Sequence, residues 1–250
     1  MKRNLYCGLL TICSILIVMG TISGCAQIPK KVEFDSSAKT RIKRIALLQI
    51  VPSQQISIRN KSNTGVILGF GFIPTLIEEG VIAEKSKKYV EMMKSKKITF
   101  VPELVAALQR ELRQNGYDVD YLQNQRPKLI DKTTVDYSNI QTESDGILNV
   151  YYGPIGYLSP EFKESYAPWV VLGVRLIDAR TKDTLYFKNF NVSQVADRIT
   201  NENIDAIFPD EKYLYQSFDE IIDKFDETIE GVLSSQEKIA VRIAQQLNRN

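Results

Sequence analysis

The sequence contains no histidine, and this absence narrows the chemistry that the protein can perform. It contains only three cysteines, Cys7, Cys13 and Cys25, all within the first tenth of the chain. Without histidine, the catalytic triads that use it as a general base and the common zinc sites are excluded. The chain beyond Cys25 has no thiol nucleophile and can form no internal disulfide. We therefore expect a domain stabilised by burial of apolar side chains, with no metal site and no cofactor.

The motifs that would indicate catalysis without histidine are also missing. The sequence has no Gly-x-Ser-x-Gly motif and no Ser-x-x-Lys in the setting of a strand-to-helix elbow. The acidic pairs Asp210-Glu211 and Asp226-Glu227 consist of neighbours, which point to different faces of a helix and are therefore expected on the surface. We predict a protein that is not an enzyme. The alternative, a histidine-independent hydrolase, would need a pocket with converging carboxylates or a Ser–Lys pair.

The charge of the chain is close to balanced, with a formal net charge of +2. Basic side chains are not interleaved with aromatic ones in any contiguous patch, so we expect no nucleic-acid partner. The segment from Lys30 to Arg44 is basic, and it either lies against anionic lipid head groups or forms an ordinary solvated linker. The region from Asp205 to Lys238 is acidic instead.

The first 25 residues have the layout of an export signal. Lys2 and Arg3 precede an apolar stretch from Leu9 to Met19, and small residues follow it. The apolar stretch is shorter than the about 20 residues that a membrane-spanning helix needs. Its end, Ile22-Ser23-Gly24-Cys25, resembles the lipobox of bacterial lipoproteins. The alternative is an uncleaved anchor in which Cys25 is an ordinary cysteine.

The lipobox resemblance implies that residues 1–24 are a signal peptide that is removed. Cys25 would be acylated and would become the new amino terminus, so the protein would be attached to a membrane by lipid. Ala26 is not the aspartate that retains lipoproteins in the inner membrane of many Gram-negative bacteria. This implies the periplasmic face of the outer membrane, or the outer leaflet of the cell membrane in a Gram-positive host.

The remaining chain is predicted to be a linker, residues 25–40, and a single α/β domain, residues 41–250. The apolar run from Ile45 to Val51 is typical of a buried strand. The pattern from Val101 to Asn115 predicts an amphipathic helix, and Tyr117 to Leu122 alternates like a strand. Strand, helix and strand together indicate a crossover unit.

Three further runs favour strands, namely Gly146 to Leu158, Trp169 to Asp178 and Thr184 to Val192. The last two are joined by a short polar connection that indicates an antiparallel hairpin. Helical spacing follows from Phe218 to Ile229, and Ser234 offers a capping box for a second helix. The expected fold is α/β, with a mixed sheet of about five strands and helices packed on it.

This order of elements resembles a superfamily that includes the TolB amino-terminal domain and the curli secretion lipoprotein. The resemblance is carried by Lys43 to Ile50, by Asn115-Gly116-Tyr117, by Asp145 to Leu148 and by the hairpin from Val174 to Tyr186. It implies a non-enzymatic accessory or assembly factor that acts in the cell envelope through contacts with another protein. The alternative that it implies is a ring-forming secretion channel subunit, and hence a homo-oligomer.

A long insertion between the first strand and the first helix, residues 52–99, departs from that pattern. It contains an apolar, glycine-rich run that we predict to contact a partner or a membrane through Val66, Ile67, Leu68, Phe70 and Phe72. The run is apolar on both faces and so is a poor strand for a barrel. The alternative is a buried strand or a loop over the core. Leu76 to Met93 has a helical pattern.

Aromatic residues gather around prolines between Tyr151 and Trp169. Exposed aromatic side chains of this kind bind glycans or peptides. Aromatic residues near strand ends are more often part of the core, and we favour that interpretation here. The cluster comprises Tyr151, Tyr152, Tyr157, Phe162, Tyr166 and Trp169.

Overall fold

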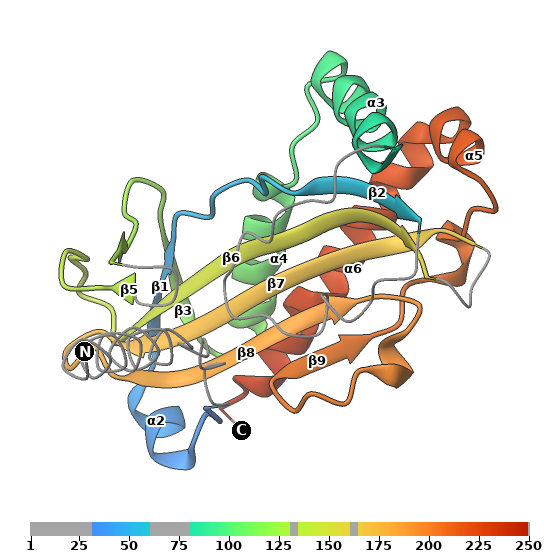
Figure 1. The fold of residues 1–250 in the computed structure, drawn as a ribbon. Helices are drawn as coiled ribbons and strands as arrows, with labels where there is room; N and C mark the ends of the chain where they lie inside the picture. Colours follow the sequence, from blue (N-terminus) through green and yellow to red (C-terminus); the bar gives the residue numbers. More distant parts are fainter. Residues whose placement is uncertain (1–31, 61–80, 131–134, 161–164, 250) are drawn as a thin grey trace, which may run out of the picture.

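The computed structural model describes residues 32–60, 81–130, 135–160 and 165–249. At its centre is a seven-stranded sheet with the order β3-β1-β6-β7-β8-β9, in which β2 also pairs with β6 (Figure 1). The strands are β1 (Arg44–Leu48), β2 (Ile56–Asn60), β3 (Asp118–Leu122), β6 (Gly146–Ser159), β7 (Ala167–Asp178), β8 (Thr184–Val192) and β9 (Ile204–Ile207).

The sheet is mixed. β1 runs parallel to both β3 and β6, and β2 is parallel to β6. β6, β7 and β8 form an antiparallel meander, and β9 returns parallel to β8. The predicted α/β class and the predicted hairpin of β7 and β8 are confirmed. The sheet has seven strands and not the expected five, because β2 and β9 were not predicted.

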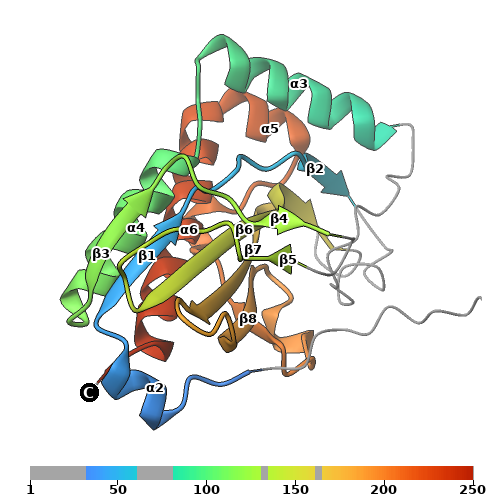
Figure 2. The ribbon, with the colours of Figure 1, turned by 90° about the vertical axis from the view of Figure 1, so that its left-hand side faces the viewer.

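Two long helices, α4 (Val101–Gln114) and α6 (Phe225–Gln246), cover one face of the sheet (Figures 1 and 2). Leu104, Leu108 and Leu112 recur along α4 at helical spacing and are fully buried. They join the main core, which lies between the helices and strands β6, β7 and β8. The predicted helix at Val101–Asn115 and the crossover from β1 through α4 to β3 are confirmed.

The carboxy-terminal helices divide at a different place from the predicted one. α5 (Phe218–Asp223) is capped by Ser217, whose Oγ accepts a hydrogen bond from the amide of Glu220 at 3.1 Å. α6 then continues without a break through Ser234, so the predicted capping box there is wrong. Ser235 Oγ instead donates to the carbonyl oxygen of Gly231 within the helix, at 2.8 Å.

The described part of the insertion belongs to the fold. It contributes β2 and a helix, α3 (Val81–Ser95), which overlaps the helix predicted at residues 76–93. Tyr89 and Met93 of α3 are buried in the main core. The amide of Ile58 in β2 donates to Ser86 Oγ of α3 at 3.0 Å, so the helix occupies the outer edge of this strand.

Ordered structure begins before the predicted domain boundary at residue 41. A short helix, α2 (Ser36–Arg41), lies within the segment predicted to be a linker, and Asp35 caps it. The capping energy and the burial of Phe34 and Ala38 against the core account for this difference.

The segment that connects β3 to β6 packs on the opposite face of the sheet. It includes a small hairpin of β4 (Lys128–Leu129) and β5 (Val135–Asp136). Tyr137 and Ile140 follow the hairpin and pack on Ile147 and Ile177 of the sheet, forming a small second core. Two single turns of 3-10 helix complete the described elements, Ala196–Arg198 and Glu211–Tyr213.

Candidate functional site

The residues predicted to carry function lie outside the described residues. These are the lipidation site Cys25, the lipobox residues Ile22, Ser23 and Gly24, and the apolar run of Val66, Ile67, Leu68, Phe70 and Phe72. The described chain does include the segments that adjoin them. It begins just after the predicted lipid attachment site, and it includes β2 and α3 on the two sides of the apolar run.

The N-terminal strap, defined here as residues 32–41, is fixed to the domain along its length. The carbonyl oxygen of Val32 accepts a hydrogen bond of 3.0 Å from the amide of Phe187, at the edge of β8. Phe34 is 8% exposed and packs in the main core. Asp35 caps α2 by accepting from the amide of Ala38 at 2.7 Å. The strap therefore sets where a tether from Cys25 would join the fold.

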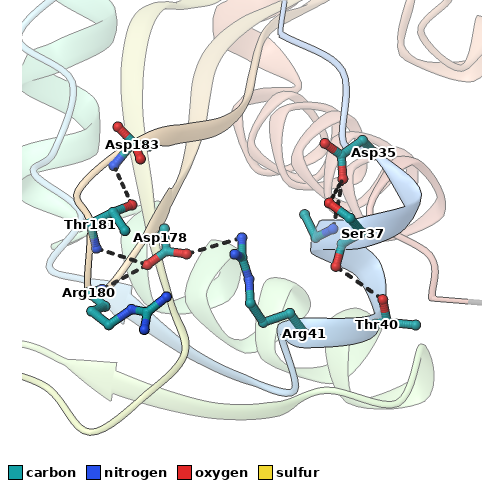
Figure 3. Close-up of polar contacts among 9 residues, drawn as sticks. Asp35, Ser37, Thr40, Arg41, Asp178, Arg180, Thr181 and Asp183 are labelled. Atoms are coloured by element: carbon teal, nitrogen blue, oxygen red, sulfur yellow. Dashed lines mark hydrogen bonds and ion pairs between the residues drawn. The ribbon is translucent and has the colours of Figure 1, made fainter.

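An ion pair closes the contact between α2 and the turn that joins β7 to β8 (Figure 3). Arg41 Nη2 lies 3.1 Å from Asp178 Oδ2. The other oxygen of Asp178 accepts from the amides of Arg180 and Thr181 at 2.9 and 3.0 Å. Burial acts to raise the pKa of Asp178, but the two amides and Arg41 outweigh it, and the pKa lies below its ordinary value. Asp178 therefore shapes the turn and holds α2 as an ionised group.

Asp145 has a similar role at the neighbouring strand ends. Its Oδ2 accepts hydrogen bonds from the amides of Lys43 and Arg44 at 2.9 and 2.8 Å. Burial acts to raise the pKa of Asp145, and these amides lower it further than burial raises it. Asp145 therefore joins the start of β1 to the start of β6. Asp145 and Asp178, which lie in the segments that carry the superfamily resemblance, both have structural roles.

The two acidic pairs make separate contacts. Asp210 accepts from Lys238 Nζ at 2.7 Å and from Ser234 Oγ at 2.8 Å. The bond from Lys238 is the main reason that the pKa of Asp210 is lowered. Asp226 has a side chain that is 76% exposed and accepts from Lys96 Nζ at 2.5 Å. The prediction that Asp226 is a surface residue is confirmed.

The aromatic cluster lies mainly in the core, as predicted. Tyr157, Tyr166 and Trp169 are buried, with exposed fractions of 3% or less. Tyr157 OH donates to the carbonyl oxygen of Thr228 in α6 at 3.0 Å. Tyr166 OH accepts from Lys85 Nζ of α3, also at 3.0 Å. The hydroxyls of Tyr157 and Tyr166 thus bind α6 and α3 to β6 and to the start of β7. Phe162, also a member of the cluster, lies outside the described residues.

Burial is the main cause that raises the pKa of each described tyrosine with a shifted value. For Tyr117, Tyr151 and Tyr215 the pKa rises to about 12. For Tyr89 and Tyr157 burial raises it still further. A phenol with a raised pKa stays neutral and is a poor general base. Tyr117 and Tyr157 use their hydroxyls to donate to the carbonyl oxygens of Leu247 and Thr228.

A shallow pocket of about 220 Å³ lies beside the N-terminal strap. It is lined by Val32, Glu33, Phe34, Tyr186, Lys188 and Gln246. Tyr186 OH donates to Gln246 Oε1 at 2.5 Å, and Lys188 Nζ lies 3.9 Å from Asp205 Oδ2. Burial and the charge of Asp205 raise the pKa of Tyr186. The lining thus presents a neutral phenol and a lysine that faces a carboxylate.

In residues 32–60, 81–130, 135–160 and 165–249, no group of three or more cysteine, aspartate or glutamate side chains is placed to hold a metal ion. Among those residues, no helix combines the length and the apolar character that crossing a bilayer requires.

Comparison with known proteins found no matching family model and no matching curated protein. Solved structures do match, at low similarity. Protein XCC0632 of family DUF330 from Xanthomonas campestris is 9% identical, with a TM-score of 0.34, over 89% of this chain and 87% of that one. A neuraminyllactose-binding hemagglutinin homolog from Helicobacter pylori is 12% identical, with a TM-score of 0.29, over 88% and 90%.

Lipoprotein GNA1162 from Neisseria meningitidis is also similar to this chain. It is 12% identical, with a TM-score of 0.21, over 60% of this chain and 81% of its own. At such identities and TM-scores, the similarity to these three structures carries no argument about function.

Proposed function

We propose that this protein is a lipid-anchored component of the bacterial cell envelope that works by binding another envelope protein and catalyses no reaction. The observation that carries the proposal is the sequence Ile22-Ser23-Gly24-Cys25 behind a short apolar stretch and a basic start. The described contacts support the non-catalytic part of the proposal. Asp178 and Asp145, whose pKa values are lowered, bind backbone amides, and Tyr157, whose pKa is raised, binds a helix, so each has a structural role.

The proposal includes the side of the envelope and the superfamily. Ala26 follows the lipidated cysteine, which supports the periplasmic face of the outer membrane in a Gram-negative host. The crossover from β1 through α4 to β3 and the hairpin of β7 and β8 support membership of the superfamily of the TolB amino-terminal domain and the curli secretion lipoprotein.

Lipidation is tested by producing the full chain in a bacterial host and measuring the mass of the purified protein. We expect the mass of residues 25–250 plus acyl groups, and we expect Cys25→Ser to keep the signal peptide and to lack the added lipid. A wild-type protein that retains residues 1–24, or that lacks the acyl groups, would overturn lipid anchoring. Cys13→Ser, inside the apolar stretch, is the matched control and should be processed normally.

The binding role is tested by crosslinking the lipidated protein in intact cells and by measuring its mass in mild detergent. We expect a monomer or dimer that crosslinks to one other envelope protein. A large closed ring would replace this role with that of a secretion channel subunit. Hydrolysis of envelope substrates by the purified protein, lost on substitution of one serine or carboxylate, would overturn the non-catalytic role.

A further inference from the structure

Two adjacent aliphatic side chains at the β4–β5 hairpin are the most exposed large apolar groups in the described part of the chain. Leu129 has 61% and Ile130 has 67% of its surface exposed. The other exposed large apolar residues, Val51 and Phe208, are single residues far apart in the sequence. Full burial of an aliphatic side chain of this size is worth about 1.5–3 kcal/mol. A pair of this kind at one point favours a binding role.

Two cationic side chains precede this pair in the sequence. Arg126 and Lys128 are exposed, and the stretch from Tyr121 to Ile130 lies in sequence between the carboxylates Asp120 and Asp131. Arg126 Nε donates to Gln49 Oε1 at 2.6 Å, which fixes the guanidinium beside the hairpin. The nearby carboxylate of Asp136, opposite Lys128, accepts from the amide and hydroxyl of Ser138 at 2.8 and 2.9 Å. Apolar side chains beside lysine and arginine suit the interface of an anionic bilayer.

The base of the hairpin is held rigidly, so the pair is presented from a fixed position. Gln125, before β4, and Gln141, after β5, exchange two hydrogen bonds of 2.8 Å. Asn139 Nδ2 donates to the carbonyl oxygen of Arg126 at 2.7 Å. Tyr137 OH accepts from Asn149 Nδ2 of the sheet at 3.0 Å. A preorganised base reduces the entropy that is lost on binding.

The hairpin and the start of the N-terminal strap, ahead of α2, lie toward the same side of the molecule. In Figure 2, the hairpin of β4 and β5 lies to the right of β3 and α4, and the described chain approaches α2 from the right, while α2 itself lies at the lower left. The helices α4 and α6 lie on the left. Residues 26–31 separate Cys25 from Val32 and can span at most about 25 Å. A lipid on Cys25 would therefore keep this side of the domain close to the bilayer.

We propose that Leu129 and Ile130 enter the surface of the anionic bilayer to which Cys25 is attached, so that the protein docks at two points. The lipid supplies the attachment, and the hairpin fixes the orientation of the domain on the membrane. This leaves the helical face of the molecule, with α4 and α6, directed away from the lipid. The inference rests on the lipid anchoring proposed above.

The test uses the lipidated full chain with one introduced thiol, since the processed protein has no other free cysteine. Ile130→Cys is labelled with an environment-sensitive fluorophore and reconstituted in vesicles of phosphatidylethanolamine and phosphatidylglycerol that contain an acyl-chain quencher. Ala106→Cys, an exposed position of α4, is the matched control. We expect several-fold stronger quenching at position 130 than at position 106, and the same result for Leu129→Cys.

The outcome for the hairpin is separable from the outcome for the anchor because the mass of each sample reports the lipid on Cys25. If the lipid is present and the vesicles carry the protein, equal quenching at positions 130 and 106 overturns the hairpin inference and leaves the anchor intact. If the lipid is absent, the proposed anchor fails and the two-point docking fails with it. Circular dichroism of each variant, compared with the unsubstituted protein, verifies that the domain is folded.

Discussion

Gly156 marks a close approach of the β6 backbone to the β2 backbone. Its φ is +143°, a value that side-chain-bearing residues rarely adopt. A Cβ at this position would lie 2.2 Å from the carbonyl oxygen of Ser57 in β2. The pairing of β6 with β7 is also irregular here, with a register shift between Tyr152 and Ile155. The bulge and the glycine together let β2 lie against β6.

Gly156→Ala is expected to destabilise the protein by about 2–4 kcal/mol, because the new methyl group must displace backbone. Urea unfolding followed by circular dichroism measures the change. Gly116→Ala is the matched control, since Gly116 also has a positive φ, of +83°, but its Cβ would meet nothing closer than 4.0 Å. That control should cost only about 1 kcal/mol. Equal costs for the two variants would contradict the close approach.

Asp178 is expected to contribute stability that depends on its charge. Since its pKa is lowered in the folded state, the contribution is present above the unfolded pKa of about 3.9 and is lost as the pH falls through the folded value. Asp178→Asn should therefore lower the free energy of unfolding by about 1–2 kcal/mol at pH 7, and the difference from wild type should shrink below about pH 4.

The control for Asp178 is its exposed neighbour Asp183, at the end of the same turn. Asp183→Asn should leave the free energy of unfolding within about 0.5 kcal/mol of wild type at both pH values. A difference for Asp178→Asn that stays constant from pH 7 to pH 3 would mean that the ion pair with Arg41 and the ionised cap do not stabilise the turn.

Among the elements, α3 protects an edge of the sheet. β2 pairs with β6 on one side, and on its other side the amide of Ile58, a fully buried residue, donates to Ser86 Oγ. An unpaired strand edge is a site for unwanted pairing between molecules. The hydroxyl of Ser86 accepts the hydrogen bond that the carbonyl oxygen of a further strand would otherwise accept, and α3 therefore covers this edge.

Ser86→Ala is expected to leave the Ile58 amide without a partner and to cost about 1–3 kcal/mol. Hydrogen exchange followed by mass spectrometry should show faster exchange in β2, while β7 keeps its protection. Ser95→Ala, at the exposed end of the same helix, removes only a bond from Ser95 Oγ to the carbonyl oxygen of Met92. Unchanged exchange in β2 of Ser86→Ala would argue against the capping role.

Most of the central elements could be predicted from sequence because they are long and strongly patterned. α4, β6, β7 and β8 fall close to their predicted bounds. β2 and β9, of five and four residues, lie outside the crossover and hairpin patterns that identified the other strands, and no local pattern reveals their pairing with β6 and β8. The start of α6 was predicted too late because Ser234 reads locally as a cap, whereas packing of Gly231 against Tyr157 and Tyr213 keeps the helix continuous.

The candidate functional features divide in the same way. The lipobox is a local motif and can be recognised from the sequence alone. The absence of histidine, which excludes catalysis by that residue, is also evident from the sequence. The N-terminal strap was missed because its attachment depends on distant partners, Phe187 and Asp178, that no local pattern reveals. Leu129 and Ile130 form too short an apolar run to stand out, and only their exposure at a braced hairpin draws attention to them.

For the whole molecule, the absence of histidine predicts a stability that is flat around neutral pH. The described aspartates with shifted values, such as Asp145 and Asp178, have lowered pKa values, so their contribution is lost only under acid conditions. Buried tyrosines have raised pKa values, so their contribution is complete below the unfolded pKa of about 10 and falls above it.

We expect the free energy of unfolding to change by less than about 0.5 kcal/mol between pH 6 and pH 8. It should decline below about pH 4 and again above about pH 10. Chemical denaturation at constant ionic strength over this range provides the measurement. A steep slope between pH 6 and pH 8 would show that a group outside the described residues titrates on unfolding.

The position of the N-terminal strap also determines how the protein would bear a mechanical load. Tension on residues ahead of Val32 acts first on the backbone hydrogen bond to Phe187, then on the buried Phe34, and then on α2 and its ion pair. Next along the chain is β1, which is paired on both sides, with β3 and β6. The strap can therefore yield as a short compliant spring while the central strand, loaded in shear against two neighbours, keeps the domain folded.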